Sequence, residues 1–146
     1  VRDVLADAGV EAVPKTSGSK GLQLYVPLDG SSPWEDVHGY ARSLAQRLEN
    51  ERADLVVWNM KKELRTGKVL VDWSQNNAAK TTIAVYSLRA RPAPTVSTPV
   101  TWDEVEACRK PADLRFTSAD VLARVEKYGD LFARCLDGGQ KLPPAE

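Results

Sequence analysis

Residues 16–21, Thr-Ser-Gly-Ser-Lys-Gly, combine the residue types that bind phosphate groups. The Ser17 hydroxyl and the Lys20 ammonium can contact phosphate oxygens, and glycines let backbone N–H groups approach an anion closely. The spacing of a P-loop is missing, and the segment joins two expected strands instead of opening a helix. Serine and glycine are also typical of ordinary turns. These six residues alone therefore favour a phosphate site and a plain hairpin turn equally.

Asp72 follows the apolar run 69–71, which reads as a strand. A carboxylate at such a position is costly to bury unless a cation meets it. A metal ion would do so, as would a salt bridge to Arg65 or Lys68, and the carboxylate can also cap the following turn. Gln75 comes three residues later, and its amide can either contact a base or sugar or close that turn. The residues themselves leave these alternatives open.

Two arginines flank these motifs, Arg65 before the strand and Arg89 beyond the next expected one. Guanidinium groups bind phosphate oxygens in pairs, so the two side chains can converge on a phosphate, although each alone is more often a surface residue. The only histidine, His38, is expected on the surface of a helix. No Asp-x-Asp pair occurs in the chain. Multi-histidine and paired-aspartate metal chemistry therefore finds no support within these residues.

The charge distribution is uneven along the 146 residues, although the net charge is zero. Residues 59–91 hold seven basic and two acidic side chains, a local charge of +5. Such a cluster is suited to binding phosphate on a nucleotide or on a nucleic-acid strand, and it is equally typical of a solvated basic face.

The longest apolar runs fall far short of a membrane span, and the N-terminus lacks a signal pattern, so we expect no membrane association and a cytoplasmic location. Cys108 and Cys135 lack the spacing of a zinc or redox pair and are expected to be reduced core thiols.

Hydrophobic periodicity and turn residues predict strands early in the chain and helices at its end. This order favours an α+β fold with helices on the faces of a sheet. Thr101 and Thr117 or Ser118 are suitable N-caps for two of the late helices. Because the chain begins inside a helix, we expect the domain to be incomplete. The expected helices are 1–8, 34–48, 59–64, 102–108, 118–128 and 130–136, and the expected strands are 10–15, 22–26, 55–58, 68–73 and 81–89.

Three separated blocks, residues 15–22, 65–76 and 80–89, have an order and spacing that closely resemble the polymerase domain of bacterial DNA ligase D and its stand-alone relatives. These proteins belong to the archaeo-eukaryotic primase superfamily. The resemblance extends to about Tyr128 and implies a mixed or antiparallel sheet with flanking helices. It predicts that residues 1–136 are the C-terminal part of a primase-polymerase domain and that 137–146 are a flexible tail.

The resemblance implies roles for six residues. Ser17 and Lys20 match the hydroxyl and the cation that contact the phosphates of the incoming nucleotide. Asp72 matches the third metal-binding aspartate, which is catalytic. The remaining matches are nucleotide-pocket side chains, with Arg89 at the triphosphate and Arg65 and Gln75 near the metal and the nucleotide. The implied cofactor is Mn²⁺ or Mg²⁺. The implied partners are ribo- or deoxyribonucleoside triphosphates, DNA ends or gapped DNA, a Ku-like end-binding protein and a DNA ligase.

Two departures from the family pattern matter for function. Gln23 stands where the superfamily commonly has histidine, so a histidine contact to the nucleotide is not carried over. The family's Asp-x-Asp motif is missing, and Asp72 alone cannot hold the two metal ions of nucleotidyl transfer. We therefore expect the nucleotide-binding part of an end-joining or gap-repair polymerase that is inactive by itself. The alternative is a non-catalytic module that binds nucleotides or DNA ends.

Overall fold

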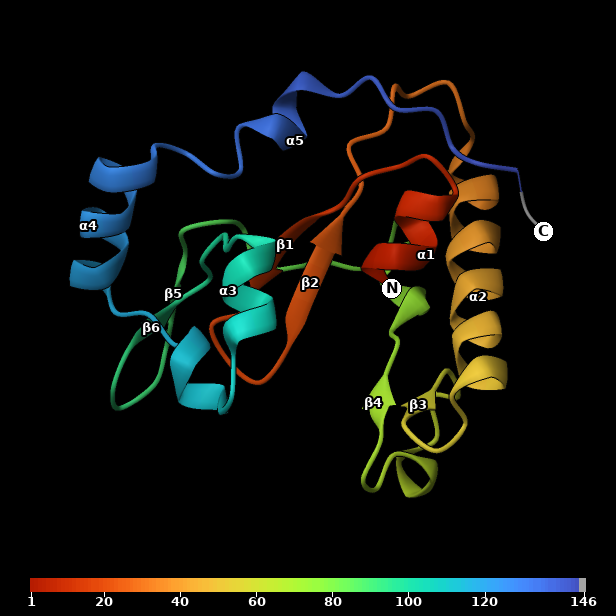
Figure 1. Cartoon of the computed structure of the whole chain (residues 1–146), viewed down its shortest axis with the longest axis horizontal. Coiled ribbons are helices and arrows are strands. Elements are labelled where there is room, and N and C mark those ends of the chain that lie inside the picture. The colour runs from red at the N-terminus through yellow and green to blue at the C-terminus, as the bar shows by residue number, and fades with distance from the viewer. Residues whose placement is uncertain (145–146) are drawn as a thin grey trace.

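The central element is a β-hairpin that carries the loop 16–21 at its turn (Figure 1). The computed structural model describes residues 1–144. The strands are β1 (Val13–Thr16), β2 (Leu22–Tyr25), β3 (Val56–Val57), β4 (Val69–Leu70), β5 (Leu88–Arg89) and β6 (Thr95–Val96). The helices are α1 (Arg2–Asp7), α2 (Trp34–Glu51), α3 (Trp102–Ala107), α4 (Ser118–Tyr128) and α5 (Arg134–Asp137), with 3₁₀ turns η1 (Lys62–Leu64), η2 (Trp73–Gln75) and η3 (Pro111–Leu114).

Strand β1 is buried along its whole length because it has neighbours on both sides. It pairs with β2 in antiparallel register, with Lys15 opposite Gln23. On its other edge Thr16 N–H donates to the Thr98 carbonyl at 2.8 Å, and Val100 N–H donates to the Pro14 carbonyl at 3.1 Å. The predicted hairpin is confirmed. Its loop is therefore anchored to the segment 96–100, which is more than 70 positions away in the sequence.

The other strands form two short pairs, β3 with β4 in parallel and β5 with β6 in antiparallel orientation. Together with the flanking helices they give the predicted α+β class with mixed and antiparallel pairing. Two expected elements are much shorter than predicted. Only the last two residues of the expected strand 81–89 pair in β5, and the expected helix 59–64 is the single turn η1. Tyr86, with φ 65°, interrupts the first of these because a left-handed residue cannot continue a strand.

The core lies between the hairpin and the helices α1 and α2. Leu5, Val10 and Ala12 are buried there, and Leu44 and Leu24 pack against them. Helix α2 continues down over β3 and η2, with Ala45 and Leu48 buried, which confirms the predicted apolar face (Figure 1). No helix within residues 1–144 combines the length and the apolar character needed to cross a bilayer.

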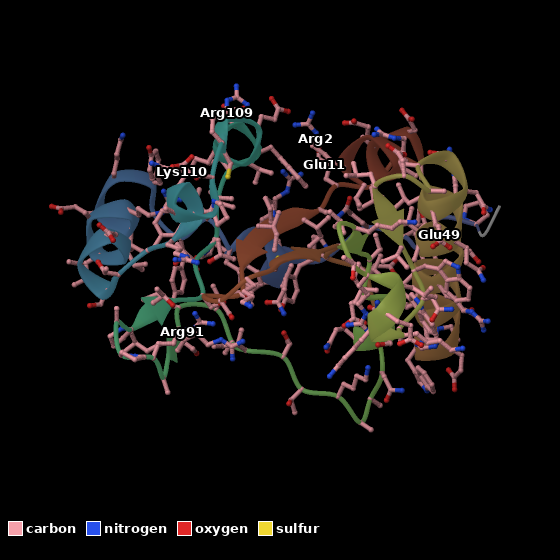
Figure 2. All side chains as sticks on the ribbon, turned by 90° about the horizontal axis from the view of Figure 1, so that it is seen from below. Arg2, Glu11, Glu49, Arg91, Arg109 and Lys110 are labelled. Atoms are coloured by element: carbon pink, nitrogen blue, oxygen red, sulfur yellow. The ribbon has the colours of Figure 1, made fainter. Side chains whose placement is uncertain are left out.

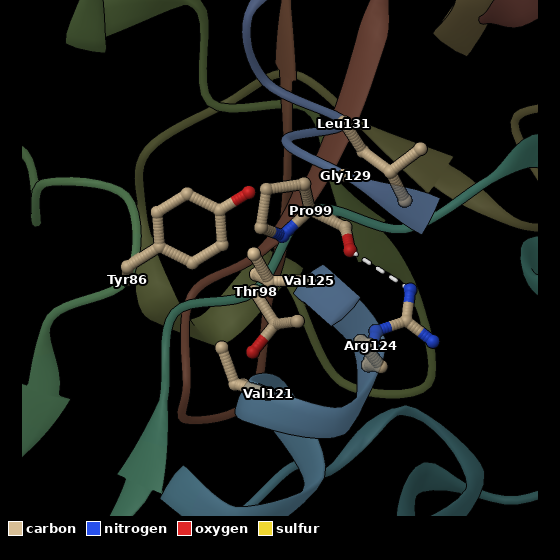
Figure 3. Close-up of a pocket in the computed structure, with 8 residues that line it drawn as sticks. All are labelled: Tyr86, Thr98, Pro99, Val121, Arg124, Val125, Gly129 and Leu131. Atoms are coloured by element: carbon tan, nitrogen blue, oxygen red, sulfur yellow. Dashed lines mark hydrogen bonds between the residues drawn. The ribbon is translucent and has the colours of Figure 1, made fainter. Parts of the chain in front are cut away.

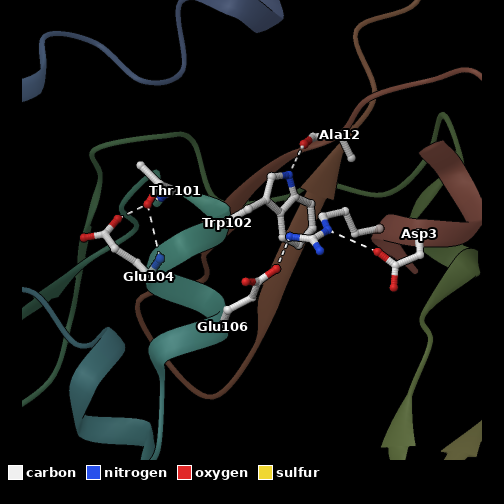
Figure 4. Close-up of polar contacts among 7 residues, drawn as sticks. Asp3, Ala12, Thr101, Trp102, Glu104 and Glu106 are labelled. Carbon is white, nitrogen blue, oxygen red and sulfur yellow. Dashed lines mark hydrogen bonds and ion pairs between the residues drawn. The ribbon is translucent and has the colours of Figure 1, made fainter.

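Helices α3 and α4 begin where the sequence predicts. The Thr101 hydroxyl accepts from Glu104 N–H at 3.2 Å, and the Glu104 carboxylate accepts from Thr101 N–H at 2.8 Å (Figure 4). Thr117 and Asp120 form the same reciprocal capping box at α4. Helix α3 is tied to α1 because Arg2 pairs with Glu106. Its Trp102 indole also donates to the Ala12 carbonyl at 3.0 Å, as Figure 4 shows.

The segment after α5 runs back across the hairpin side of the molecule (Figure 1). Asp29 N–H donates to the Gln140 carbonyl at 2.8 Å, and the Gln140 amide donates to the Glu11 carbonyl at 2.9 Å. Part of the expected tail 137–146 is thus hydrogen-bonded to the fold. Residues 145–146 lie outside the described residues, and the domain boundary at residue 136 stays a prediction.

Both cysteines are free, as expected, but they are half-buried and not core residues.

Candidate functional site

The hairpin loop 16–21 is folded by the side chain of Ser17. Its hydroxyl oxygen accepts from Ser19 N–H at 3.2 Å and from Gly21 N–H at 3.1 Å, while Ser17 N–H donates to the Gly21 carbonyl at 2.8 Å. Gly18 supplies the left-handed residue of the turn, with φ +66°. The Ser17 hydroxyl keeps its own hydrogen as a donor. The loop thus presents an ordered hydroxyl beside a tight turn.

Arg89 on β5 lies directly against this loop. Its Nε donates to the Ser17 carbonyl at 3.1 Å, which leaves its two terminal amino groups without protein partners among residues 1–144. Thr95 and Arg91 fix the loop further by donating to the Gly18 carbonyl and the Ser19 hydroxyl. The structure therefore brings Ser17 and Arg89 together, as a shared phosphate site requires.

Lys20 lies at the exposed tip of the same loop. Its ammonium makes no hydrogen bond or ion pair with the part of the chain that the structure describes. A cation on a flexible stem can reach an anion bound beside the Ser17 hydroxyl. Ser17, Arg89 and Lys20 are called the phosphate cradle below.

Lys15 is a charged residue of this region that sequence reasoning did not select. Its side chain is fully buried, and its Nζ donates to the Gln23 amide oxygen at 2.6 Å, the Ser97 hydroxyl at 2.7 Å and the Ile83 carbonyl at 3.0 Å. Burial lowers the pKa of Lys15 to about 8, and the nearby positive charge of Arg89 acts in the same direction. No local signal could have selected it, because a lysine in a strand is ordinarily exposed and Lys15 is buried only by the neighbours of β1 on both edges.

Gln23, which was expected to depart from the family pattern, forms hydrogen bonds inside the fold. Its amide oxygen accepts from Lys15, and its amide nitrogen donates to the Thr82 hydroxyl at 2.5 Å. This pair of bonds ties the hairpin to the loop that follows η2. In this arrangement Gln23 positions Lys15 and Thr82.

Asp72 and its neighbours form a second polar group, called the carboxylate group below. Asp72 Oδ1 accepts from Ser74 N–H at 3.2 Å and from the Ser74 hydroxyl at 2.6 Å, so the carboxylate caps η2. Lys80 Nζ donates to the same hydroxyl at 2.6 Å. Of the structural alternatives, the cap is the one observed, and among residues 1–144 Asp72 forms no ion pair with Arg65 or Lys68. The Asp72 side chain is exposed, so its second oxygen is accessible to a ligand.

Arg65 reaches this group through Met60. It donates to the Met60 carbonyl, and the Met60 sulfur lies 3.9 Å from the Ser74 hydroxyl. The Nε of Arg65 is buried without a hydrogen-bond partner in the described part of the chain. Such a donor is costly unless an acceptor arrives. Gln75 is exposed at the end of η2 and completes the group.

Aromatic packing on α2 holds η2 in place. His38 Nδ1 lies 2.5 Å from the Asn76 carbonyl, and its ring meets the Trp73 ring edge-on at 5.1 Å. Arg42 lies over Trp73 and Trp58, 5.4 and 5.5 Å from the ring centroids. His38, expected on the surface of a helix, is half-buried there and packs its ring against η2. Contacts between α2 and η2 are non-local, so a polar helical neighbourhood did not reveal them.

The phosphate cradle and the carboxylate group are held on different strand pairs. Figure 2 shows the segment after η2 crossing from the side of β3 and β4 to the labelled Arg91 beyond β5. No hydrogen bond within residues 1–144 joins the two groups directly. The crossing segment is instead attached to the hairpin through Thr82 and Ile83. No three His, Cys, Asp or Glu side chains of the described chain gather to hold a metal ion.

Tyr86 ends the crossing segment shortly before β5. Its N–H donates to the Ser97 carbonyl at 2.7 Å, and its hydroxyl donates to Asp130. Figure 3 shows its ring beside a small cavity near α4. Apart from Tyr86, the lining residues are Thr98, Pro99, Val121, Arg124, Val125, Gly129 and Leu131. Since this lining is largely apolar, the cavity serves packing and adds no ligand site.

Several relatives that are similar to this chain in sequence share the name LigD. It is 53% identical over 133 residues to the multifunctional non-homologous end joining protein LigD of Mycolicibacterium smegmatis, covering 91% of this chain and 17% of the relative. It is 50% identical over 134 residues to the LigD of Mycobacterium tuberculosis H37Rv, covering 92% and 17%. The bifunctional LigD of Bacillus subtilis is 32% identical over 130 residues, covering 88% and 21%. The chain thus spans about a fifth or less of these relatives.

The fold is likewise similar to a solved structure, the polymerase domain of Mycobacterium tuberculosis ligase D in complex with DNA. The TM-score is 0.85 at 48% identity, and the match covers 94% of this chain and 47% of that one. The family model described as LigD, primase-polymerase domain, matches residues 1–132. The hairpin, its loop and the carboxylate group all lie within this range. The chain therefore belongs to the LigD primase-polymerase domain family.

Proposed function

We propose that this chain is the nucleotide-binding part of a DNA-dependent polymerase that acts in bacterial non-homologous end joining or gap repair. The parent protein would transfer ribo- or deoxyribonucleotides to a primer 3′-hydroxyl. DNA ends or gapped DNA would be its substrate, and a Ku-like end-binding protein and a DNA ligase its partners. The names of the relatives and the DNA in the related complex support this assignment.

The observation that carries the proposal is the contact between Arg89 and the Ser17 loop. One guanidinium nitrogen holds the loop backbone, and the two others remain available for an anion. The Ser17 hydroxyl and the exposed Lys20 ammonium lie on the same loop. A hydroxyl, a guanidinium and an ammonium thus lie on or against one loop, which suits the binding of a triphosphate. Arg65, with its unpaired Nε, and Gln75 would contact the nucleotide from the carboxylate group.

A divalent metal, Mn²⁺ or Mg²⁺, fits this chain only in part. Asp72 has one carboxylate oxygen in the cap of η2 and an exposed side chain, so it suits a single metal ligand. The described residues contain no group of three ligands, and one carboxylate does not hold two ions. The chain's own residues therefore fit nucleotide binding and supply one metal ligand at most.

Replacing Arg89 tests the cradle directly. Arg89→Gln removes the two free guanidinium donors, and we expect the affinity for a nucleoside triphosphate to fall about 10-fold or more, since a charge-assisted hydrogen bond contributes about 1.5–3 kcal/mol. Isothermal titration calorimetry on the whole chain measures this loss. Arg109→Gln is the control, because Arg109 is exposed beyond α3 and within residues 1–144 its side chain donates only to the Glu106 backbone carbonyl (Figure 2). Equal affinities for both variants would contradict the cradle.

Primer extension separates the proposed function from its alternative, a non-catalytic module that binds nucleotides or DNA ends. The lone carboxylate of the carboxylate group favours that alternative. We expect this chain to extend no primer on its own in Mn²⁺, because it offers one metal ligand. Joined to the sequence that precedes it in its parent protein, it should extend a primer, and Asp72→Asn should abolish that extension. Robust synthesis by the chain alone, or none by the longer protein, would overturn the proposal.

A further inference from the structure

Among residues 1–144, the buried ammonium of Lys15 has no anionic partner. Its three acceptors are the amide of Gln23, the hydroxyl of Ser97 and the carbonyl of Ile83, all of them uncharged. None of the ion pairs within residues 1–144 includes Lys15. Burying a charge without a counter-charge is costly, so fully buried lysines are rare and need a reason.

Lys15 is connected to the phosphate cradle by a short chain of hydrogen bonds. Its Nζ donates to the Ser97 hydroxyl at 2.7 Å, and that hydroxyl donates to the Thr16 carbonyl at 2.8 Å, at the start of the loop. The Thr16 hydroxyl in turn accepts from Thr98 N–H at 3.0 Å. The loop backbone is therefore positioned by a network that starts at the buried charge.

The charged or titratable side chains that face Lys15 are Arg89 on β5 and Tyr25 on β2. Arg89 is close enough to lower the pKa of Lys15 by repulsion, and the Tyr25 ring centroid lies 5.4 Å from Nζ. The segments that contain Ile83 and Ser97 face it with uncharged groups. Two cations thus lie beside the Ser17 loop, and neither forms an ion pair with a carboxylate of residues 1–144, which produces a positive potential in a region of low dielectric.

We propose that Lys15 is a positioning residue whose buried charge is compensated by the phosphates of the bound nucleotide. It holds the loop, the crossing segment and Ser97 together, and it attracts the triphosphate from beneath the cradle without touching it. The inference rests on the proposed nucleotide site and adds to it the anion that balances Lys15. Because the attraction is electrostatic, its contribution grows with the number of phosphates on the ligand.

Binding also couples to protonation of Lys15. Its pKa of about 8 means that the side chain is only partly charged near that pH. A bound triphosphate favours the charged form and raises the pKa, so the complex takes up a fraction of a proton near pH 8. A purely structural lysine would produce no such uptake.

Calorimetric titration of the whole chain with ATP, AMP and adenosine tests this inference. Lys15→Met should weaken ATP binding about 10-fold, AMP binding less and adenosine binding least. Lys127→Met, an exposed lysine on α4, is the matched control and should bind all three as the unmodified chain does. A structural role predicts instead that Lys15→Met weakens all three ligands equally, and that result would overturn the inference.

Proton uptake gives a second measurement that needs no variant. ATP titrations of the unmodified chain near pH 8, in two buffers of different ionisation enthalpy, should give heats that differ in the direction of proton uptake. At this pH the terminal phosphate of ATP, whose second pKa lies at about 6, is already ionised and takes no part in the uptake. Equal heats in both buffers near pH 8 would contradict the role of Lys15 alone. Failure of the unmodified chain to bind ATP would instead contradict the proposed function.

Discussion

Gly18→Ala is expected to cost about 2–4 kcal/mol in the free energy of unfolding, from strain at a positive φ and from overpacking. A Cβ at residue 18 would lie 2.9 Å from Arg89 Cγ and 3.1 Å from Ser97 N. The nearest side chain is that of the cradle arginine, and the nearest backbone belongs to the network around Lys15. Relief of the clash must displace one of them. We therefore expect triphosphate affinity to fall together with stability.

Gly30→Ala is the matched control for this change. Gly30 has a similar φ of +79°, but a Cβ there meets nothing within 4 Å. Gly30→Ala should lower the free energy of unfolding by only about 1 kcal/mol, which is the conformational cost of a side chain at a positive φ. Its nucleotide affinity should be unchanged. Urea unfolding and ATP titration of both variants measure the difference. Equal effects of the two substitutions on stability and affinity would contradict the close approach of the loop to Arg89.

Arg124→Met is expected to destabilise the fold by about 2–4 kcal/mol, since it leaves a half-buried carboxylate without its partner. Arg124 pairs with Glu104, and its side chain is only 14% exposed. It also donates to the Pro99 carbonyl at 3.1 Å and lies over the Phe116 ring. This residue therefore connects α4 to α3 and to the segment that flanks β1. Urea unfolding near neutral pH measures the loss, and Arg134→Met, which removes an exposed pair with Glu11, should change little.

The same pair predicts a pH dependence. The hydrogen bond from Arg124 holds the pKa of Glu104 below its usual value, so the folded state binds this proton less readily than the unfolded state. The stabilisation is thus present above the unfolded-state pKa of about 4.3 and is lost as pH falls through the lower folded-state pKa. The stability difference between Arg124→Met and the unmodified chain should shrink in that acidic range. A difference that is independent of pH would show that packing, not the ion pair, carries the effect.

Local patterns were sufficient to predict most of the helices and the hairpin. Helix α4 follows from Thr117 and an amphipathic run, and the hairpin follows from two apolar stretches around a Ser-Gly loop. Each of these signals lies within a few neighbouring residues of the sequence. The expected strand 81–89 is shortened to β5. Its β-branched residues favour a strand, whereas the left-handed Tyr86 and its bond to Ser97 depend on a distant partner.

The candidate site was predictable in its parts but not in its arrangement. Ser17, Asp72 and Arg89 stand out by residue type and neighbourhood. Lys15 did not, because a lysine in a strand is ordinarily exposed, and only the pairing of β1 on both edges buries it. The use of Gln23 within the fold likewise depends on Thr82, which is 59 positions away. Contacts of this range leave no local signal in one sequence.

The central claim is that a nucleotide binds at the Ser17 loop and Arg89. The most direct test is two-dimensional ¹H–¹⁵N NMR of this 16.0 kDa chain during an ATP titration, since amide shifts locate the ligand. We predict saturable shifts at residues 16–21, at Arg89 and at the crossing segment near Thr82, with little change on α4. Saturable shifts confined to other surfaces, or none at all, would contradict the account.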